Sequence, residues 1–233
     1  MSNDKSKYKI TIIKDGPYIV SGNIPLVEKI IYYNGRGYEY KDGREFPQSK
    51  QYSLCRCGKS KNPPFCDGTH VKCNFDGTET ASKTNFLDRI ESKIEGPALD
   101  LLDDGRCAFA RFCHRENGDV WELTEKSDNL ENRDEAIKGA YECPAGRLVA
   151  LTKSGDAIEP EYEPSVEILQ DSEMKVSGPI FVKGNIPIKS SNGYTYEIRN
   201  RVTLCRCGKS DNKPFCDSKH VSTGYLDNNR RKL

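Results

Sequence analysis

Residues 55–70 read CRCGKSKNPPFCDGTH, and residues 205–220 read CRCGKSDNKPFCDSKH. Both blocks have the spacing C-x-C-x8-C-x3-H, with Pro-Phe directly before the third cysteine and Asp directly after it. A second pair of matching stretches precedes them, GPYIVSGNIP at residues 16–25 and GPIFVKGNIP at residues 178–187. A duplication of this kind predicts two similar modules in one chain.

The residue types in each block predict a metal-binding pocket. Thiolates are strong ligands for zinc and for iron–sulfur clusters, and two of them one residue apart can hold one metal from the same side. Proline fixes the backbone that approaches the third cysteine, and the Asp after that cysteine suits a turn or helix start that brings the histidine to the same site. We therefore expect four ligands to converge in each repeat.

The two blocks resemble the CDGSH, or mitoNEET-type, family, whose pattern is C-x-C-x2-[ST]-x3-P-x-C-D-G-[STA]-H. The first block matches this pattern at every specified position, whereas the second has Ser218 and Lys219 where the family has glycine and a small residue. In that family three cysteines and one histidine bind the iron of one [2Fe–2S] cluster. The resemblance implies two clusters, one on Cys55, Cys57, Cys66 and His70, and one on Cys205, Cys207, Cys216 and His220. Because nearby charge tunes a cluster's reduction potential, Lys219 predicts a higher potential for the second cluster.

Zinc is the main alternative metal, because three cysteines and one histidine also form structural zinc sites. Zinc ligands are typically spaced C-x2–4-C and H-x3–5-H, whereas here the first pair is C-x-C. We therefore favour iron and keep a zinc-stabilised interaction module as an alternative. Disulfides are disfavoured, because cysteines one residue apart cannot pair with each other without strain and because the chain begins without a signal-peptide pattern.

A third cysteine group lies between the repeats. Cys107 and Cys113 have the spacing C-x5-C, and Cys143 precedes Pro144. Bacterial ferredoxins carry C-x2-C-x2-C with a distant Cys-Pro, and here Ala110 stands at the second cysteine. Roughly residues 97 to 151 resemble single-cluster ferredoxins, which implies a [3Fe–4S] cluster, or a [4Fe–4S] cluster with a non-cysteine fourth ligand, on Cys107, Cys113 and Cys143. A structural module with three buried thiols remains the alternative.

The apolar patterns predict a β-rich α+β fold. Short alternating strands are expected at residues 8–13, 29–33, 181–183 and 194–204. Helices are expected at residues 84–94 and 132–141, from apolar positions on one face. We expect CDGSH module 1 at residues 1–80, a ferredoxin-like α+β module at 81–165 and CDGSH module 2 at 166–233. Family members usually pair two CDGSH units, which implies an intramolecular pseudo-dimer and a monomeric protein.

Composition and motifs narrow the function. The 36 basic and 35 acidic residues nearly cancel, and no apolar run is long enough to span a bilayer, so we expect a cytoplasmic protein without nucleic-acid or membrane partners. No catalytic motif is present, so we expect no enzyme activity. The leading interpretation is electron transfer between redox partner proteins. A cluster carrier that serves apo acceptors, or a redox or pH sensor, is the alternative, because a protonated histidine can leave iron.

Overall fold

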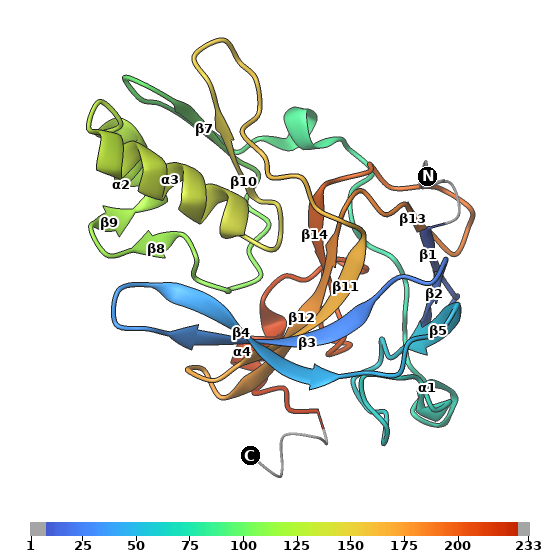
Figure 1. Cartoon of the computed structure of the whole chain (residues 1–233). Helices are drawn as coiled ribbons and strands as arrows, with labels where there is room; N and C mark the ends of the chain where they lie inside the picture. Colours follow the sequence, from blue (N-terminus) through green and yellow to red (C-terminus); the bar gives the residue numbers. More distant parts are fainter. Residues whose placement is uncertain (1–7, 228–233) are drawn as a thin grey trace.

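The computed structural model describes residues 8–227, and its two largest sheets each take strands from both repeats (Figure 1). The four-stranded sheet has the order β13-β1-β2-β5, and the five-stranded sheet has the order β14-β12-β11-β3-β4. The first contains β1 (Lys9–Ile12), β2 (Tyr18–Ser21), β5 (Gln51–Leu54) and β13 (Ile188–Lys189). The second contains β3 (Leu26–Tyr33), β4 (Tyr38–Glu45), β11 (Ser165–Asp171), β12 (Val176–Lys183) and β14 (Arg201–Leu204).

The two repeats are joined by parallel strand pairs. Strand β1 pairs with β13, and β3 pairs with β11. One apolar core contains side chains of both repeats, among them Ile10, Leu26, Val166 and Leu204. The hydroxyl of the buried Tyr18 donates to the carbonyl of Cys205 at 2.8 Å. The expected β-rich fold, in which two modules pair within one chain, is confirmed.

The insert between the repeats has its own small core. Strands β6 (Ser92–Glu95), β7 (Asp100–Asp103) and β10 (Leu148–Leu151) form an antiparallel sheet in the order β10-β7-β6. Helices α2 (Val120–Glu125) and α3 (Leu130–Glu142) pack against it, and β8 (His114–Arg115) pairs with β9 (Gly118–Asp119). The side chains of Asp119 and Asn129 cap the two helices, which explains where each helix begins. Helix α3 covers the helix expected at residues 132–141.

The helix expected at residues 84–94 is wrong. Residues 86–89 form only a short 3-10 helix, η2 (Phe86–Arg89), and the chain then continues as strand β6. The backbone N–H of Glu91 donates to the carbonyl of Asp103 at 2.9 Å, and residues 92–95 pair with β7. Phe86 is buried in a cluster with Leu102 and Val149. Pairing with β7 therefore outweighs the helical spacing of the apolar residues.

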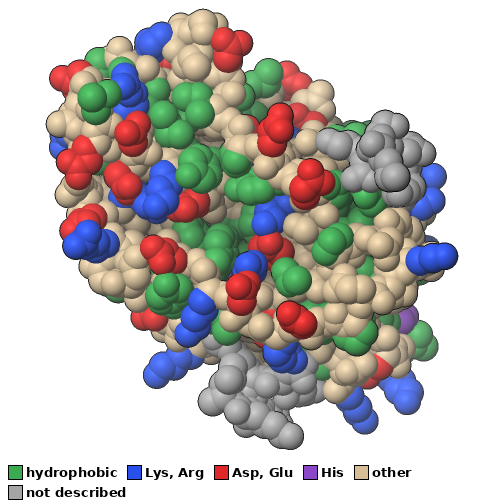
Figure 2. Space-filling model, in the orientation of Figure 1, with side chains coloured by type: hydrophobic (Ala, Val, Ile, Leu, Met, Phe, Trp, Pro, Cys, Tyr) green, Lys and Arg blue, Asp and Glu red, His purple; other side chains and the backbone are tan. Residues whose placement is uncertain are grey.

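One expected strand is shorter in the structure than the sequence predicted. The strand expected at residues 194–204 begins only at Arg201, and Thr195 forms an isolated bridge with Lys189. Short helices α1 (Thr69–Lys72) and α4 (Lys219–Ser222) follow the third cysteine of each block. Within residues 8–227 no helix has both the length and the apolar character needed to cross a membrane. Acidic and basic side chains are interspersed over the face seen in Figure 2.

Candidate metal centres

Each outer block brings its four predicted ligands together as two close pairs. In the first block the Sγ atoms of Cys55 and Cys57 lie 3.6 Å apart, and Cys66 Sγ lies 3.3 Å from His70 Nδ1. In the second block the corresponding distances are 3.6 Å and 3.5 Å. We call the first set site 1 (Cys55, Cys57, Cys66 and His70) and the second set site 2 (Cys205, Cys207, Cys216 and His220).

The same loop architecture holds the pairs in place. In the first block Ser60 Oγ donates to the carbonyl of Phe65 at 2.6 Å, which closes the loop before the third cysteine. Asp67 accepts from the backbone N–H groups of Lys61 at 2.8 Å and Thr69 at 3.0 Å, which ties this loop to the start of α1. Ser210 and Asp217 make the equivalent contacts in the second block. The sequence analysis assigned Asp67 and Asp217 to a turn or helix start. It gave Ser60 and Ser210 no role, although the presence of serine at this position in both repeats is a usable signal.

A buried arginine anchors each cysteine pair from behind. Arg56 donates to the carbonyls of Ile13, Gly16 and Gly77. Arg206 donates to the carbonyls of Gly178 and Leu169 and also pairs with the carboxylate of Asp227 at 2.7 Å. Among the described residues only the second of these arginines is therefore neutralised by a carboxylate.

In the insert, all three predicted cysteines line one cavity. Cys107, Cys113 and Cys143, which we call the middle site, surround it together with Ala110 and Arg147. The segment 107–113 bends tightly, because Phe109 and Arg111 have the positive φ angles 56° and 66°. The backbone N–H of Phe109 points at Cys107 Sγ at 3.3 Å. Strained backbone conformations of this kind concentrate at functional sites.

Comparison with protein-family models finds three matching segments. Residues 15–71 and 177–221 match the iron-binding zinc finger of CDGSH type, and residues 94–153 match the divergent 4Fe-4S mono-cluster family. The chain is therefore an iron–sulfur protein in which two CDGSH-type iron-binding modules flank a divergent 4Fe-4S segment. No curated protein and no solved structure matches it.

The two CDGSH modules differ in how far their sites are covered. Cys66 and His70 are half-buried, whereas Cys216 is 4% and His220 3% exposed. Cys216 packs with Ala108 and Ala145 of the insert, and Cys143 packs against the same cluster. In Figure 1, α4 lies on the side of the insert and α1 on the far side. The insert therefore covers site 2 and leaves site 1 open.

The charges around site 2 also differ from expectation. Lys219, whose cation was expected to act on the second cluster, forms an ion pair with Asp211, so its charge is compensated. Burial lowers the pKa of His220 to about 4, and the nearby Arg206 acts in the same direction. The ion pair between Arg111 and Asp171, at 2.8 Å, provides charges of both signs that also act on this histidine.

Within each CDGSH pair the two thiols are not equivalent. A hydrogen bond from Cys57 holds the pKa of Cys55 below its usual value against the effect of burial, and the backbone N–H groups of residues 58–60 act in the same direction. The pKa of Cys57 is raised in turn. Cys205 and Cys207 repeat this relation. Each loop is thus built to stabilise negative charge on sulfur before any metal binds.

The two C-x-C loops of the CDGSH modules touch each other. A Cβ atom on Gly58 would lie 2.5 Å from the carbonyl oxygen of Cys207, and one on Gly208 would lie 2.6 Å from that of Cys57. Both glycines have positive φ angles, +72° and +76°. Only glycine permits this conformation and this close approach together.

Three further residues that could be taken for site residues lie outside the sites. His114 is exposed on β8. The Cys73 thiol donates to the carbonyl of His70 at 3.6 Å and belongs to neither close pair of site 1. Trp121 packs against the core of the insert, and its Nε1–H donates to Asp103 at 3.2 Å.

Proposed function

We propose that this CDGSH-type protein binds one [2Fe–2S] cluster at site 1 and one at site 2, and that it transfers electrons. The observation that supports this most strongly is the division of each ligand set into two close pairs. In a [2Fe–2S] cluster each of the two irons takes two protein ligands, so two separate pairs are what such a cluster requires.

The same geometry disfavours zinc. A structural zinc ion needs four ligands in a tetrahedron around one point. Within residues 8–227 no three Cys, His, Asp or Glu side chains gather closely enough to hold one metal ion. A zinc-stabilised interaction module would require both pairs in each block to move together.

We also propose that the middle site binds a third cluster on Cys107, Cys113 and Cys143. Its cavity lining includes these three thiols and, among the described residues, no histidine or carboxylate. Three thiolates without a fourth protein ligand suit a [3Fe–4S] cluster, or a [4Fe–4S] cluster whose fourth iron takes a non-protein ligand. Burial raises the pKa of Cys113 to about 12 and also raises that of Cys143, so an empty cavity would keep these thiols protonated.

Electron transfer is favoured because the sites adjoin one another. The insert packs directly on Cys216 of site 2, and the loops that hold site 1 and site 2 touch at Gly58 and Gly208. Such an arrangement gives electrons a short path through one chain. We propose redox proteins as external partners, a carrier role without catalysis of its own, and a monomer whose two CDGSH modules serve as the usual pair.

One observation favours a second role for site 1 alone. Cys66 and His70 are half-buried, so water or an acceptor protein can reach this pair while the insert covers its equivalent in site 2. Cluster transfer to an apo acceptor, or sensing of pH or redox state, would therefore take place at site 1 rather than at site 2.

Iron and acid-labile sulfide analysis of anaerobically purified protein, combined with electron paramagnetic resonance, tests the proposal. We expect about seven iron atoms per chain for two [2Fe–2S] clusters and one [3Fe–4S] cluster, and about eight if the middle cluster is [4Fe–4S]. An iron content of about four atoms per chain would mean that both CDGSH clusters are present and that the middle site is empty. Stoichiometric zinc without sulfide would contradict the proposal as a whole.

A further inference from the structure

The second repeat carries a buried carboxylate that the first repeat lacks. When the two blocks are aligned on their ligands, Arg56 corresponds to Arg206, and Gly77 corresponds to Asp227. Both arginines stand between the two cysteines of a C-x-C pair, and both are 2% exposed. The arginines therefore occupy equivalent positions beside their own ligands, and only their partners differ.

In the second repeat the charge of the arginine is balanced inside the protein. Arg206 Nη1 pairs with Asp227 Oδ2 at 2.7 Å, and the two side chains are 2% and 1% exposed. Gln170 also donates to Asp227, at 3.1 Å, and holds the carboxylate in place. The same Gln170 donates to Glu28, which pairs with Arg44 at 2.6 Å. This network therefore contains two positive and two negative side chains.

In the first repeat, among residues 8–227, no carboxylate takes the place of Asp227. The Arg56 guanidinium lies over the rings of Tyr18 and Phe75, at 5.1 Å and 5.6 Å from their centroids, and donates to three backbone carbonyls. A Cβ atom on Gly77 would lie 3.1 Å from Arg56 Nη1, so this position faces the guanidinium as that of Asp227 does. The side chain that would balance the charge is simply missing.

Two other carboxylates of this region have different partners. Asp15, which is exposed, accepts from a backbone N–H at 2.9 Å. Glu79 accepts from the hydroxyls of Ser191 at 2.7 Å and Tyr196 at 2.9 Å. Neither of them forms an ion pair with Arg56. Water also screens the charge of an exposed carboxylate, so Asp15 cannot replace a buried partner.

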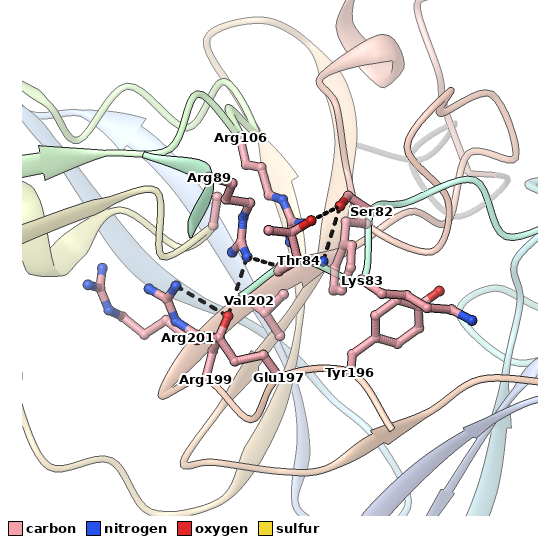
Figure 3. Close-up of a pocket in the computed structure, with 12 residues that line it drawn as sticks. Ser82, Lys83, Thr84, Arg89, Arg106, Tyr196, Glu197, Arg199, Arg201 and Val202 are labelled. Carbon is pink, nitrogen blue, oxygen red and sulfur yellow. Dashed lines mark hydrogen bonds and ion pairs between the residues drawn. The ribbon is translucent and has the colours of Figure 1, made fainter. Parts of the chain in front are cut away.

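The junction between the insert and the second module does not change this comparison. Its narrow cavity is lined by several guanidinium groups, among them those of Arg89, Arg106 and Arg199. In Figure 3, Arg89 and Arg199 converge on the carboxylate of Glu197, at 3.3 Å and 4.0 Å. The groove that contains Arg106 and Cys216 is also lined by three carboxylates, those of Glu91, Asp104 and Asp217. The junction therefore presents no excess of guanidinium groups over carboxylates to site 2.

The missing carboxylate matters because reduction adds one electron, and so one negative charge, to a cluster. A positive charge nearby in buried surroundings stabilises the reduced form and raises the reduction potential. Arg56 keeps this effect at site 1, whereas Asp227 cancels it at site 2. The exposure of Cys66 and His70 acts in the same direction, because water also stabilises the more highly charged form.

We propose that Asp227 sets the direction of electron flow between the two CDGSH sites, because it neutralises Arg206 and keeps the potential of site 2 below that of site 1. This order, which rests on the proposed function, is opposite to the one predicted from Lys219. Reduced site 2 loses one electron, oxidised site 1 gains it, and an oxidised partner protein takes it from site 1.

Redox titration of the full-length protein, followed by electron paramagnetic resonance, measures both potentials. Two variants assign them: Cys66→Ala should remove the step of higher potential, and Cys216→Ala the step of lower potential. Asp227→Asn should raise the potential of site 2. At a fixed applied potential, the ratio of oxidised to reduced cluster at site 2 should fall about tenfold, which corresponds to about 59 mV for one electron. The potential of site 1 should move less.

Asp42→Asn is the matched control for the loss of a carboxylate. Asp42 is also the acidic member of an ion pair, with Lys29 at 2.5 Å, but its side chain is 86% exposed. Because water screens this charge, neither potential should move. Arg56→Gln provides a second test that does not depend on Asp227. It should lower the potential of site 1 toward that of site 2.

Iron and sulfide analysis of each variant separates this inference from the proposed function. Protein without [2Fe–2S] clusters would contradict both. With the clusters present, a site 2 potential equal to or above that of site 1 would overturn the inference alone. The same conclusion would follow if Asp227→Asn left the site 2 potential unchanged. Should Asp227→Asn fail to fold, an unchanged site 1 potential in Arg56→Gln would overturn the inference instead.

Discussion

His70 and His220 hold the same place in the two repeats but face different surroundings. His70 is half-buried beside an exposed helix end, whereas His220 is 3% exposed beneath the insert. Because a histidine ligand binds iron only as neutral imidazole, protonation competes with the metal. The lowered pKa of His220, about 4, means that its neutral form persists through mild acid, in the range between 4 and the ordinary value of about 6.5.

We therefore predict that site 1 loses its cluster before site 2 as the pH falls. Two matched variants isolate the sites: Cys216→Ala disrupts site 2 and retains site 1, and Cys66→Ala disrupts site 1 and retains site 2. At about pH 5.5 the visible absorbance of the site 1 protein should bleach about tenfold faster than that of the site 2 protein, since water and acid reach His70 more easily. Adding His70→Cys to Cys216→Ala should slow the bleaching. Equal bleaching rates in all three proteins would show that histidine exposure does not control cluster loss.

At the residue scale the sequence predicted that the three cysteines and the histidine of each block approach one another. It predicted neither their division into two close pairs nor their surroundings. The C-x-C spacing and the Asp after the third cysteine are local features, so the distances within sites 1 and 2 follow from short segments. The burial of Cys216 depends on Ala108 and Ala145, which are distant from it in sequence. The ion pair that compensates the charge of Lys219 with that of Asp211 was not predicted either, because the sequence pattern covers only residues next to the histidine.

Among the elements, the loop 107–113 has the clearest functional shape. Two of its residues adopt left-handed backbone conformations, and its two cysteines face Cys143, which follows α3. Left-handed conformations cost non-glycine residues about 1–2 kcal/mol each, so this loop needs compensating interactions. A cluster bound to all three cysteines would provide them.

Replacing Cys143 by serine should therefore remove the paramagnetic signal of the middle cluster and lower the iron content by about three or four atoms per chain, while the CDGSH signals remain. Cys73→Ser is the matched control, because Cys73 is also partly buried but lies outside the three sites. It should change neither the iron content nor the spectra. Unchanged spectra in Cys143→Ser would mean that the insert is a structural module with three buried thiols.

The elements of the insert also show where sequence patterns mislead. Helix α3 was predicted at residues 132–141 from apolar residues on one face, and the structure adds the capping residue Asn129 and a total length of 13 residues. The expected helix at residues 84–94 had similar spacing but no cap: Asn85 makes no side-chain capping bond, and strand β7 offers hydrogen-bond partners instead. Short amphipathic stretches cannot reveal a strand partner that lies later in the chain.

For the whole molecule, the contact between the two C-x-C loops decides how the halves fit together. Alanine at Gly58 would have to adopt a φ of +72° and would place its Cβ 2.5 Å from the carbonyl oxygen of Cys207. Alanine at Gly155 would face only the first problem, because its φ is +93° and nothing lies within 4 Å. The two substitutions therefore separate backbone strain from loss of the contact.

We predict that Gly58→Ala lowers the free energy of unfolding by roughly 1–3 kcal/mol more than Gly155→Ala does. Denaturant titration of both variants measures the difference. In Gly58→Ala the iron content of both CDGSH sites should fall, because each loop supports the other. Equal stability of the two variants would mean that the loops tolerate separation.

The order of the sites along the molecule predicts a relay from the middle site to site 2 and then to site 1. The Cys66→Ala protein retains the middle site and site 2, whereas the Cys216→Ala protein retains the middle site and site 1. Both proteins are studied in the reduced state. Adding Cys143→Ser should make the remaining [2Fe–2S] signal easier to saturate with microwave power in the Cys66→Ala protein, because a nearby paramagnet is lost. The Cys216→Ala protein should show little change. A similar effect in both would contradict the proposed order.

The two sequence repeats predicted much of the overall arrangement of the molecule. Two copies of one module imply a pair, and pairing within the chain is what the shared sheets provide. The position of the insert was not predictable, because no motif indicates that it packs on the second module. Nor did any pattern show that Arg89, Arg106 and Arg199, which are separated by up to 110 residues, would meet at one cavity.

Covalent fusion of the two CDGSH modules removes a constraint that two identical subunits would impose. In a homodimer every substitution occurs twice, so neither centre can be altered without altering the other. Here the parallel pairs β1–β13 and β3–β11 join two halves with separate sequences. Ser218 can replace a glycine, and the insert can cover one centre, without any change to the opposite half. One polypeptide can thus pair a sheltered centre with an accessible one, and dilution cannot separate them.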